Sequence, residues 1–303
     1  MLRILLLFVL SFAACRAAAQ LSLGQEQLVR PLHDMKIQSM PKVDNEQLLK
    51  IELNRHRQDR PTHFAHPFAV DINPSQTGHW DFVGETAIWR TVVESRSAYS
   101  INLGFSEYYL PQEAALYIYD YHQIEKSNPF TAADNEDHEQ LWTPIISSDK
   151  IVIEVNIPIA MMEDLRLQLS YVNHDFIDIR KSTSKSCHID VNCSAENGHP
   201  EVEEFRNQIR AVGLFTLSGS SVCSGFLINN TRQDCTPYFM TAFHCNLNQE
   251  NAPSMVTYWN YENSSCREPG SPTSAAQGDG SFDTFNTGAT LSLIHISEPT
   301  RPY

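Results

Sequence analysis

Three stretches between residues 80 and 180 repeat aliphatic side chains at every second position. They are 116–121, 151–157 and 165–171. In an extended chain this period turns one face toward a core and the other toward water. With short polar turns between them, these stretches predict an all-β domain of the β-sandwich type over 80–180.

The cysteines divide the chain unevenly. Cys15 lies near the N-terminus, and none occurs from residue 20 to 186. The other six are Cys187, Cys193, Cys223, Cys235, Cys245 and Cys266. Because an exported chain can keep disulfides, this split predicts an unlinked domain followed by a disulfide-linked one. The polar, basic stretch 178–186 is the predicted boundary, with 181–186 as its linker.

The N-terminus has the pattern of a secretory signal peptide. A positive start at Met1–Arg3 precedes the apolar run Ile4–Phe12, and Ala17–Ala19 supplies small residues for cleavage. We therefore expect 1–19 to be a signal peptide and the protein to be secreted and extracellular. A lipid anchor on Cys15 is the alternative. No later apolar stretch approaches the ~20 residues of a membrane span, so no span is expected.

The net charge and the length of the chain limit the expected binding partners and the expected number of domains. The chain has 303 residues, of which 36 are acidic and 22 basic, for a net charge of −14. Phosphate contacts need clustered lysine and arginine, so a nucleic-acid partner is not expected. At roughly 150 residues per domain, two domains are predicted. Residues 20–66 are polar without a strong period, apart from one short helix expected around 48–53.

Residues 238–245 carry the strongest chemical signal. An apolar strand ends in Thr241-Ala242 and is followed by Phe243, His244 and Cys245. Imidazole titrates near neutrality, so a histidine at the start of a loop suits a general base. Further short strands are predicted around it, at Ile209–Leu217, Val222–Ile228, Tyr238–Ala242 and Val256–Tyr261. Residues 269–290 predict an irregular loop or a weak edge.

The same region resembles the secreted lysyl endopeptidases, which are trypsin-fold serine proteases made as zymogens. Besides the Thr-Ala-Phe-His-Cys run, the segments that carry the resemblance are Cys187–Cys193, Ile209–Gly213, Cys223–Thr231, Tyr258–Tyr261 and Ser265–Cys266. Ser97–Phe105, Phe130–Asn135 and Leu141–Pro144 resemble the pro-segment of such precursors.

The resemblance implies a fold, a reaction and pairings. Residues 187–290 would be the N-terminal part of the protease domain, a partial first β-barrel of two, preceded by the pro-segment 20–79 and the pro-domain 80–180. His244 would be the base of a Ser-His-Asp triad that cleaves after lysine. The implied disulfides are Cys193–Cys266 and Cys223–Cys245. Cys187 and Cys235 have no implied partner here, and a bond between them stays open.

The other triad members have no counterpart. The family's Ser-Asp-Phe-type strand and Gly-x-Ser-Gly-type loop do not occur, and Ser218–Ser221 precedes the histidine on an expected hairpin. Asp279 and Asp283 are alternatives for the orienting acid. We therefore expect a C-terminally truncated precursor that is inactive by itself. The mechanism needs no metal or organic cofactor; its partners are protein or peptide substrates and its own pro-segment.

The last residues do not continue the pattern. Leu291–Arg301 looks like one reading frame of a transposase-type sequencing adapter, so we expect native sequence to stop near Thr290 and 291–303 to be non-native.

Lysine usage supports the expected specificity. Between residues 187 and 290 there are four arginines and no lysine, whereas Lys181 and Lys185 mark the boundary. A protease that cuts after lysine benefits from a body without lysine. We expect the complete precursor to process itself after Lys181 or Lys185.

Other interpretations of these residues are weaker. The cysteines and histidines lack the paired spacing of structural zinc. His63 and His66 are flanked by prolines, which favours a loop without a ligand role. The tyrosines at 117, 119 and 121 could bind a sugar, but sheet packing is commoner. The tryptophans at 80, 89 and 142 are expected in the sandwich core. The alternative function is an exported β-sandwich binding protein with a degenerate, non-catalytic protease-like module.

Overall fold

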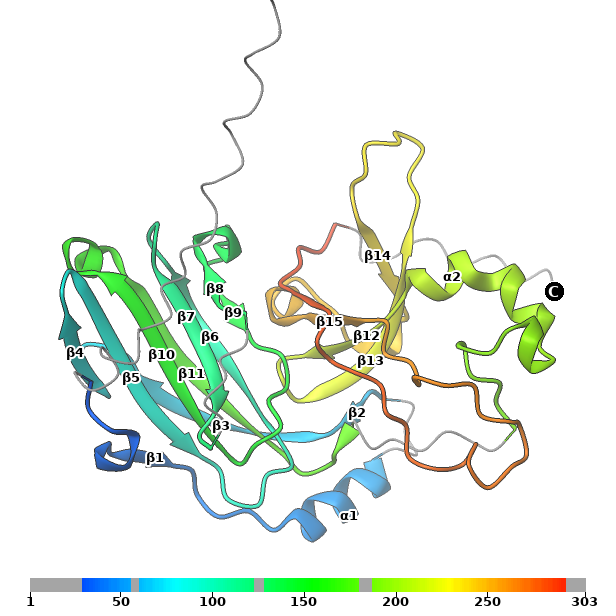
Figure 1. Ribbon diagram of the computed structural model, residues 1–303, viewed down its shortest axis with the longest axis horizontal. Helices are drawn as coiled ribbons and strands as arrows, with labels where there is room; N and C mark the ends of the chain where they lie inside the picture. The colour runs from blue at the N-terminus through cyan, green and yellow to red at the C-terminus, as the bar shows by residue number, and fades with distance from the viewer. Residues whose placement is uncertain (1–28, 56–59, 123–127, 180–186, 293–303) are drawn as a thin grey trace, which may run out of the picture.

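The computed structural model describes residues 29–55, 60–122, 128–179 and 187–292 of the chain (Figure 1). Within these ranges the protein is built mainly from β-strands in three sheets, so the predicted all-β class is confirmed. No helix in the described ranges is long and apolar enough to cross a membrane. The signal peptide, Lys181 and Lys185 lie outside the described residues, as does most of the tail from 291.

Two of the sheets form a sandwich from the first half of the chain. The first has the order β1-β5-β10-β7-β8, with β4 beside β5, and the second has the order β3-β11-β6-β9. The strands of the first are β1 (Ile37–Ser39), β4 (His79–Val83), β5 (Thr86–Glu94), β7 (Ala115–Asp120), β8 (Phe130–Thr131) and β10 (Lys150–Pro158). Those of the second are β3 (Ala65–Ile72), β6 (Ile101–Tyr109), β9 (Leu141–Trp142) and β11 (Arg166–Asp175).

The period-two pattern explains the core between these sheets. Ile151, Ile153 and Val155 of β10 are fully buried in a cluster that also includes Leu103 of β6 and Leu169 of β11. The three stretches predicted from the period are therefore confirmed as β7, β10 and β11. Each buried aliphatic side chain stabilises the fold by about 1.5–3 kcal/mol relative to exposure, and this cluster is the largest one formed by the described residues.

The outer face of the first sheet is covered by the N-terminal described segment. Met35, just after the short 3₁₀ helix Leu32–Asp34, packs with Tyr117, Tyr119 and Val152 in a separate buried cluster. The two tyrosines are therefore buried sheet residues, which confirms packing over sugar binding. β1 pairs with β5 in parallel, so residues before 80 belong to the sandwich sheets as well.

The third sheet is formed by the second half of the chain and has the order β14-β13-β12-β15-β16. Its strands are β12 (Val212–Leu217), β13 (Ser221–Ile228), β14 (Tyr238–Thr241), β15 (Val256–Trp259) and β16 (Phe285–Thr287), and β2 (Thr62–His63) adds to β13. Among the described residues β14 and β16 do not pair, so the sheet is open. The strands predicted at 222–228, 238–242 and 256–261 are confirmed, each within a few residues.

One predicted strand starts late. Residues 209–211 were expected to be extended, but they belong to helix α2 (Arg206–Ala211), and the strand begins at Val212. The cause is the 3₁₀ helix Pro200–Phe205 directly before it, which begins with proline and acidic residues. Proline and acidic side chains in a first turn favour a helix start. The helix predicted around 48–53 is present as α1 (Asn45–Arg55).

A shared core joins the third sheet to the sandwich. Phe64, Trp142 and Ile145 pack with Val256 and Tyr258 in one buried cluster. The Tyr258 hydroxyl accepts a hydrogen bond from the backbone N–H of Ile145 at 3.1 Å. Figure 1 shows the third sheet beside the sandwich, with β2 between the two. The two halves therefore bury apolar side chains against each other.

Trp142 corrects one expectation. It was expected in the sandwich core with Trp89, which does lie there, but Trp142 belongs to the cluster shared with the third sheet. The ring lies over Gly104, its partner across β6 and β9, where an added Cβ would be 2.6 Å from the ring. A glycine at this position leaves room for the indole on the outer face of the second sheet.

Candidate functional site

His244 lies on a single 3₁₀ turn, Phe243–Cys245, that directly follows β14. Its side chain is exposed, whereas Cys245 beside it is buried. A disulfide from Cys245 to Cys223 ties the turn to β13. Asn246, with φ +60°, ends the turn in the left-handed region that asparagine tolerates. The chain thus presents one imidazole at the end of a strand on a covalently fixed turn.

The end of β14 has a further anchor that the sequence did not reveal. The Thr241 hydroxyl donates a hydrogen bond to the backbone oxygen of Ser224 at 2.8 Å and lies 3.1 Å from the sulfur of Cys245. It therefore ties the last residue of β14 to both β13 and the disulfide. The Thr-Ala-x-His-Cys spacing could have suggested this, because it places the hydroxyl four residues before the sulfur.

The His244 ring makes no hydrogen bond or ion pair with any residue that the structure describes. Asp279, one alternative for an orienting acid, instead accepts hydrogen bonds from the backbone N–H and hydroxyl of Ser264, which lower the pKa of its carboxyl. Asp283 does not contact the imidazole either. Among the described residues, the histidine stands without an acid or a hydroxyl partner.

Two histidines lie close to disulfide sulfurs. A ring nitrogen of His244 is within 4.8 Å of the sulfurs of Cys223 and Cys245, and His199 is similarly placed by Cys193 and Cys266. A cysteine binds zinc as a thiolate, and sulfurs joined in a disulfide are not thiolates. With both disulfides formed, neither cluster offers a ligand set for zinc.

The structure contains both disulfides that the resemblance implies, Cys193–Cys266 and Cys223–Cys245. Cys187 and Cys235 are exposed free thiols, so the bond left open between them is not formed. Cys235 instead lines a shallow pocket along the loop between β13 and β14.

A partly buried ion pair, not anticipated from the sequence, stabilises the start of the second half. The Asp190 carboxylate accepts hydrogen bonds from Nε and a terminal nitrogen of Arg267, at 2.8 and 2.9 Å, and from Asn263 at 2.7 Å. The hydrogen bonds from Arg267 are the main reason that the pKa of Asp190 is lowered. Asp190 and Arg267 lie close in sequence to Cys193 and Cys266. The ion pair and the disulfide therefore join the same two segments of the chain.

Ser218–Ser221 is the hairpin between β12 and β13, as expected, and not a nucleophile loop. His63 and His66 lie in β2 and β3 rather than in a loop. The backbone N–H of His63 donates to the buried Glu52, and burial lowers the pKa of its ring. Neither histidine belongs to a potential ligand cluster in the described part of the chain.

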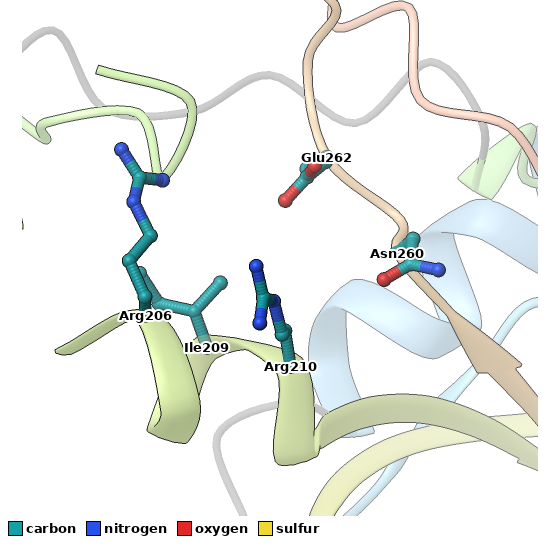
Figure 2. Close-up of a pocket in the computed structure, with 5 residues that line it drawn as sticks. All are labelled: Arg206, Ile209, Arg210, Asn260 and Glu262. Carbon is teal, nitrogen blue, oxygen red and sulfur yellow. The ribbon is translucent and has the colours of Figure 1, made fainter. Parts of the chain in front are cut away.

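A second pocket lies between α2 and the segment after β15 (Figure 2). It is lined by Arg206, Ile209, Arg210, Asn260 and Glu262. Arg206 is already engaged, since its guanidinium donates to the backbone oxygens of Val191 and Cys193 at 2.6 Å each. The pocket does not include His244, and its lining carries both signs of charge, so we assign it no role in the chemistry.

Comparison with known proteins relates this chain to the lysyl endopeptidases. The family described as the C-terminal domain of lysyl endopeptidase matches residues 181–298. A lysyl endopeptidase of Pseudomonas aeruginosa is 30% identical over 138 residues, which cover 41% of this chain and 29% of that protein. The chain therefore spans less than a third of this relative. The family match extends beyond Thr290, to residue 298. That residues 291–303 are non-native stays a prediction.

Proposed function

We propose that this chain is the precursor part of an exported serine endopeptidase that cleaves peptide bonds after lysine, with His244 as the general base. The observation that carries the proposal is the exposed imidazole on a disulfide-fixed turn at the end of β14, inside the region similar to lysyl endopeptidases. In this family the reaction is acyl transfer, so the imidazole must exchange a proton with a serine hydroxyl.

The position of His244 suits that exchange. Its ring nitrogens are unengaged by the described residues, so they can meet a hydroxyl and a carboxylate supplied from elsewhere in the complete protein. The imidazole would take the proton of the attacking serine and return it to the leaving amine, while an aspartate holds the ring in one tautomer. The disulfide Cys223–Cys245 keeps the turn in place during both steps.

In the same proposal the sandwich is a pro-segment that is separated by a cut after Lys181 or Lys185. The shared apolar cluster around Phe64 and Tyr258 supports a close partnership between the two parts. The absence of lysine from 187–290 supports it as well, because a lysine-specific enzyme then has no site for cutting its own body. A start of the mature protein upstream of residue 170 would count against this processing.

The test uses the complete protein encoded by the gene. Replacing His244 with alanine should lower kcat for a lysyl ester by about 10⁴- to 10⁶-fold, because removing one triad member disables the whole unit. His199→Ala is the matched control, since His199 also lies beside a disulfide, and it should leave the rate within about twofold. Equal rates for the wild type and His244→Ala would overturn the proposal.

One observation favours the second function, a binding protein with a degenerate protease-like module. The His244 imidazole has no acid or hydroxyl partner among the described residues. The native sequence that follows codon 290 distinguishes the two proposed functions. A Gly-x-Ser-Gly loop there supports the protease, and its absence supports the binding protein. In either case we expect the 303-residue chain alone not to hydrolyse lysyl esters.

A further inference from the structure

The turn between β12 and β13 is seated on the outer face of the second sandwich sheet. We call Ser218–Ser220 the glycine turn. The backbone oxygen of Gly219 accepts a hydrogen bond from the side-chain amide of Asn102 at 2.9 Å. Asn102 lies 117 residues earlier in the chain, on β6, so this contact joins the two halves.

The surface beneath the turn is a connected set of polar side chains. We call Ser100, Asn102, Asn173 and Asp175 the amide pocket. The Asn173 amide donates to the Asn102 side-chain oxygen at 2.9 Å, and the Asn102 amide also donates to Asp175 at 3.2 Å. The Ser100 hydroxyl donates to the other Asp175 oxygen. All four residues are at most 2% exposed. Burying a carboxylate is costly unless donors surround it, and this network supplies them.

The contact leaves no space at the centre of the turn. Gly219 has φ +60°, which disfavours any side chain. A Cβ placed there would be 2.1 Å from the Asn102 side-chain oxygen and 2.2 Å from the Asn173 side-chain nitrogen. The position therefore requires glycine for two reasons, the backbone conformation of the hairpin and the side chains of the sandwich beneath it.

Residues 62–64 of the first half extend the same contact. The backbone N–H of Phe64 donates to the oxygen of Ser220 at 3.0 Å, and β2 pairs with β13 at Ser221 and Val222. Next to these bonds lies the shared apolar cluster of Phe64 and Tyr258. An apolar centre supplies affinity in an interface, whereas directional polar contacts fix the orientation of the partners.

The polar character of the amide pocket also suits a sandwich that can separate from the third sheet. Outward-facing asparagine and aspartate side chains are typical of a sheet face that can stand in water. A sandwich released from its partner would therefore expose polar groups at this place rather than an apolar patch. A permanent core gains nothing from such groups, since a buried polar atom without a partner costs free energy, and the Asn173 side-chain oxygen has no hydrogen-bond partner among the described residues.

We propose that the amide pocket is a receptor for the glycine turn, and that it keeps the sandwich and residues 187–292 associated without a covalent link after the chain is cut between 180 and 186. The partner of the sandwich is thus a tight β-hairpin with glycine at its tip. The proposal rests on the proposed division into pro-segment and protease-related region. It does not depend on catalysis, because association is measured without any assay of activity.

The test starts from the full chain, in which residues 180–186 are replaced by the recognition sequence of a site-specific protease. After cutting, gel filtration over a range of concentrations gives the apparent Kd of the two pieces. We expect the wild-type pieces to co-elute. Gly219→Ala should weaken the association by about tenfold to a hundredfold, because overpacking costs about 1–3 kcal/mol. Separation of the wild-type pieces at all concentrations would overturn the proposal.

Gly270→Ala is the control for backbone strain. Gly270 lies in the same piece, has φ +81° and has no atom within 4 Å of an added Cβ. We expect its Kd to stay within about fivefold of the wild type. If both alanine variants weaken association equally, strain rather than the pocket explains the loss, and the proposal fails.

Variants of the amide pocket test the same contact from the side of the sandwich, and Asn102→Ala does so even if Gly219→Ala does not fold. Asn102→Ala removes the hydrogen bond without adding bulk and should weaken association by about tenfold. Combining Asn102→Ala and Asn173→Ala opens the space that the new methyl group needs. In that background the effect of Gly219→Ala should fall to that of Gly270→Ala. An unchanged effect would mean that the methyl group does not meet the amide pocket, which contradicts the proposal.

Discussion

The sandwich and the third sheet are stabilised in different ways. The sandwich has one large cluster of buried side chains and contains no cysteine. The cluster that belongs to the third sheet alone is small, with Phe215, Leu217, Cys245 and Met255 as its buried members, and its larger cluster includes residues of the sandwich. Both disulfides lie in this half.

This contrast shows how two β regions of one chain reach a folded state. A domain with enough apolar burial needs no cross-link, whereas a small core is supplemented by disulfides or by a partner. The third sheet uses both means. The stability of the third sheet therefore depends on residues before 180 and on whether its disulfides are formed. The stability of the sandwich depends less on the disulfides and on the hairpin between β12 and β13.

Removing both disulfides should have the largest effect and should be confined to the third sheet. The disulfides close loops with sequence separations of 73 and 22 residues. In the chain-entropy treatment these contribute about 4 and about 3 kcal/mol. In Cys193→Ser with Cys223→Ser, hydrogen exchange should accelerate across β12–β15 and stay slow in β5 and β10. Equal acceleration in both halves would contradict the contrast.

Phe64→Ala should come next, at about 3–5 kcal/mol of unfolding free energy. Its side chain is fully buried in the shared cluster, so the cavity should lower protection in the third sheet although residue 64 lies far from it in sequence. Phe82→Ala is the control, because Phe82 is exposed, and should change stability by less than about 0.5 kcal/mol. A loss restricted to the sandwich strands would show that the core is not shared.

Gly219→Ala should cost about 2–4 kcal/mol of the free energy of unfolding in the uncut chain, from strain and from the clash with the amide pocket. Gly84→Ala, at nearly the same φ (+61° against +60°) but with open space around its Cβ, should cost about 1 kcal/mol. Chemical denaturation of both variants gives the difference. Equal losses would mean that the hairpin does not seat on the sandwich.

The smallest effect concerns the ion pair of Asp190 with Arg267. Since Arg267 lowers the folded-state pKa of Asp190, the carboxylate stabilises the fold fully above its unfolded pKa of about 3.9 and loses this effect as pH falls through the folded pKa. Asp190→Asn should cost about 1–2 kcal/mol at pH 7. The difference from the wild type should shrink below about pH 4 in urea titrations. A difference that does not vary with pH would rule out the ion pair as its cause.

Local patterns in the sequence predicted much of this molecule. The strands β7, β10 and β11 follow from their period of two, and the His244 turn follows from a run of a few residues. Strand β3 was not predicted, because Pro67 favoured a loop and outweighed the apolar alternation of Phe68, Val70 and Ile72. Helix α2 was missed because the apolar residues after Ile209 outweighed the helix-start signal at Pro200.

Contacts between distant segments left no such signal. Neither the pairing of Asp190 with Arg267 nor the seat of Gly219 on Asn102 can be inferred from spacing, since 77 and 117 residues separate the partners. The position of Trp142 depends on Gly104 across the sheet, which only the strand register reveals. Such contacts depend on the tertiary arrangement, which period and composition do not specify.

The central claim, that His244 is the general base of a lysine-specific protease, is tested most directly by covalent labelling. A lysyl chloromethyl ketone places its reactive carbon beside the catalytic imidazole when the lysine side chain is bound. Mass spectrometry of the treated complete protein should find one adduct, on His244, and none on His199. An adduct shared evenly among the exposed histidines, or absent from His244, would contradict the account.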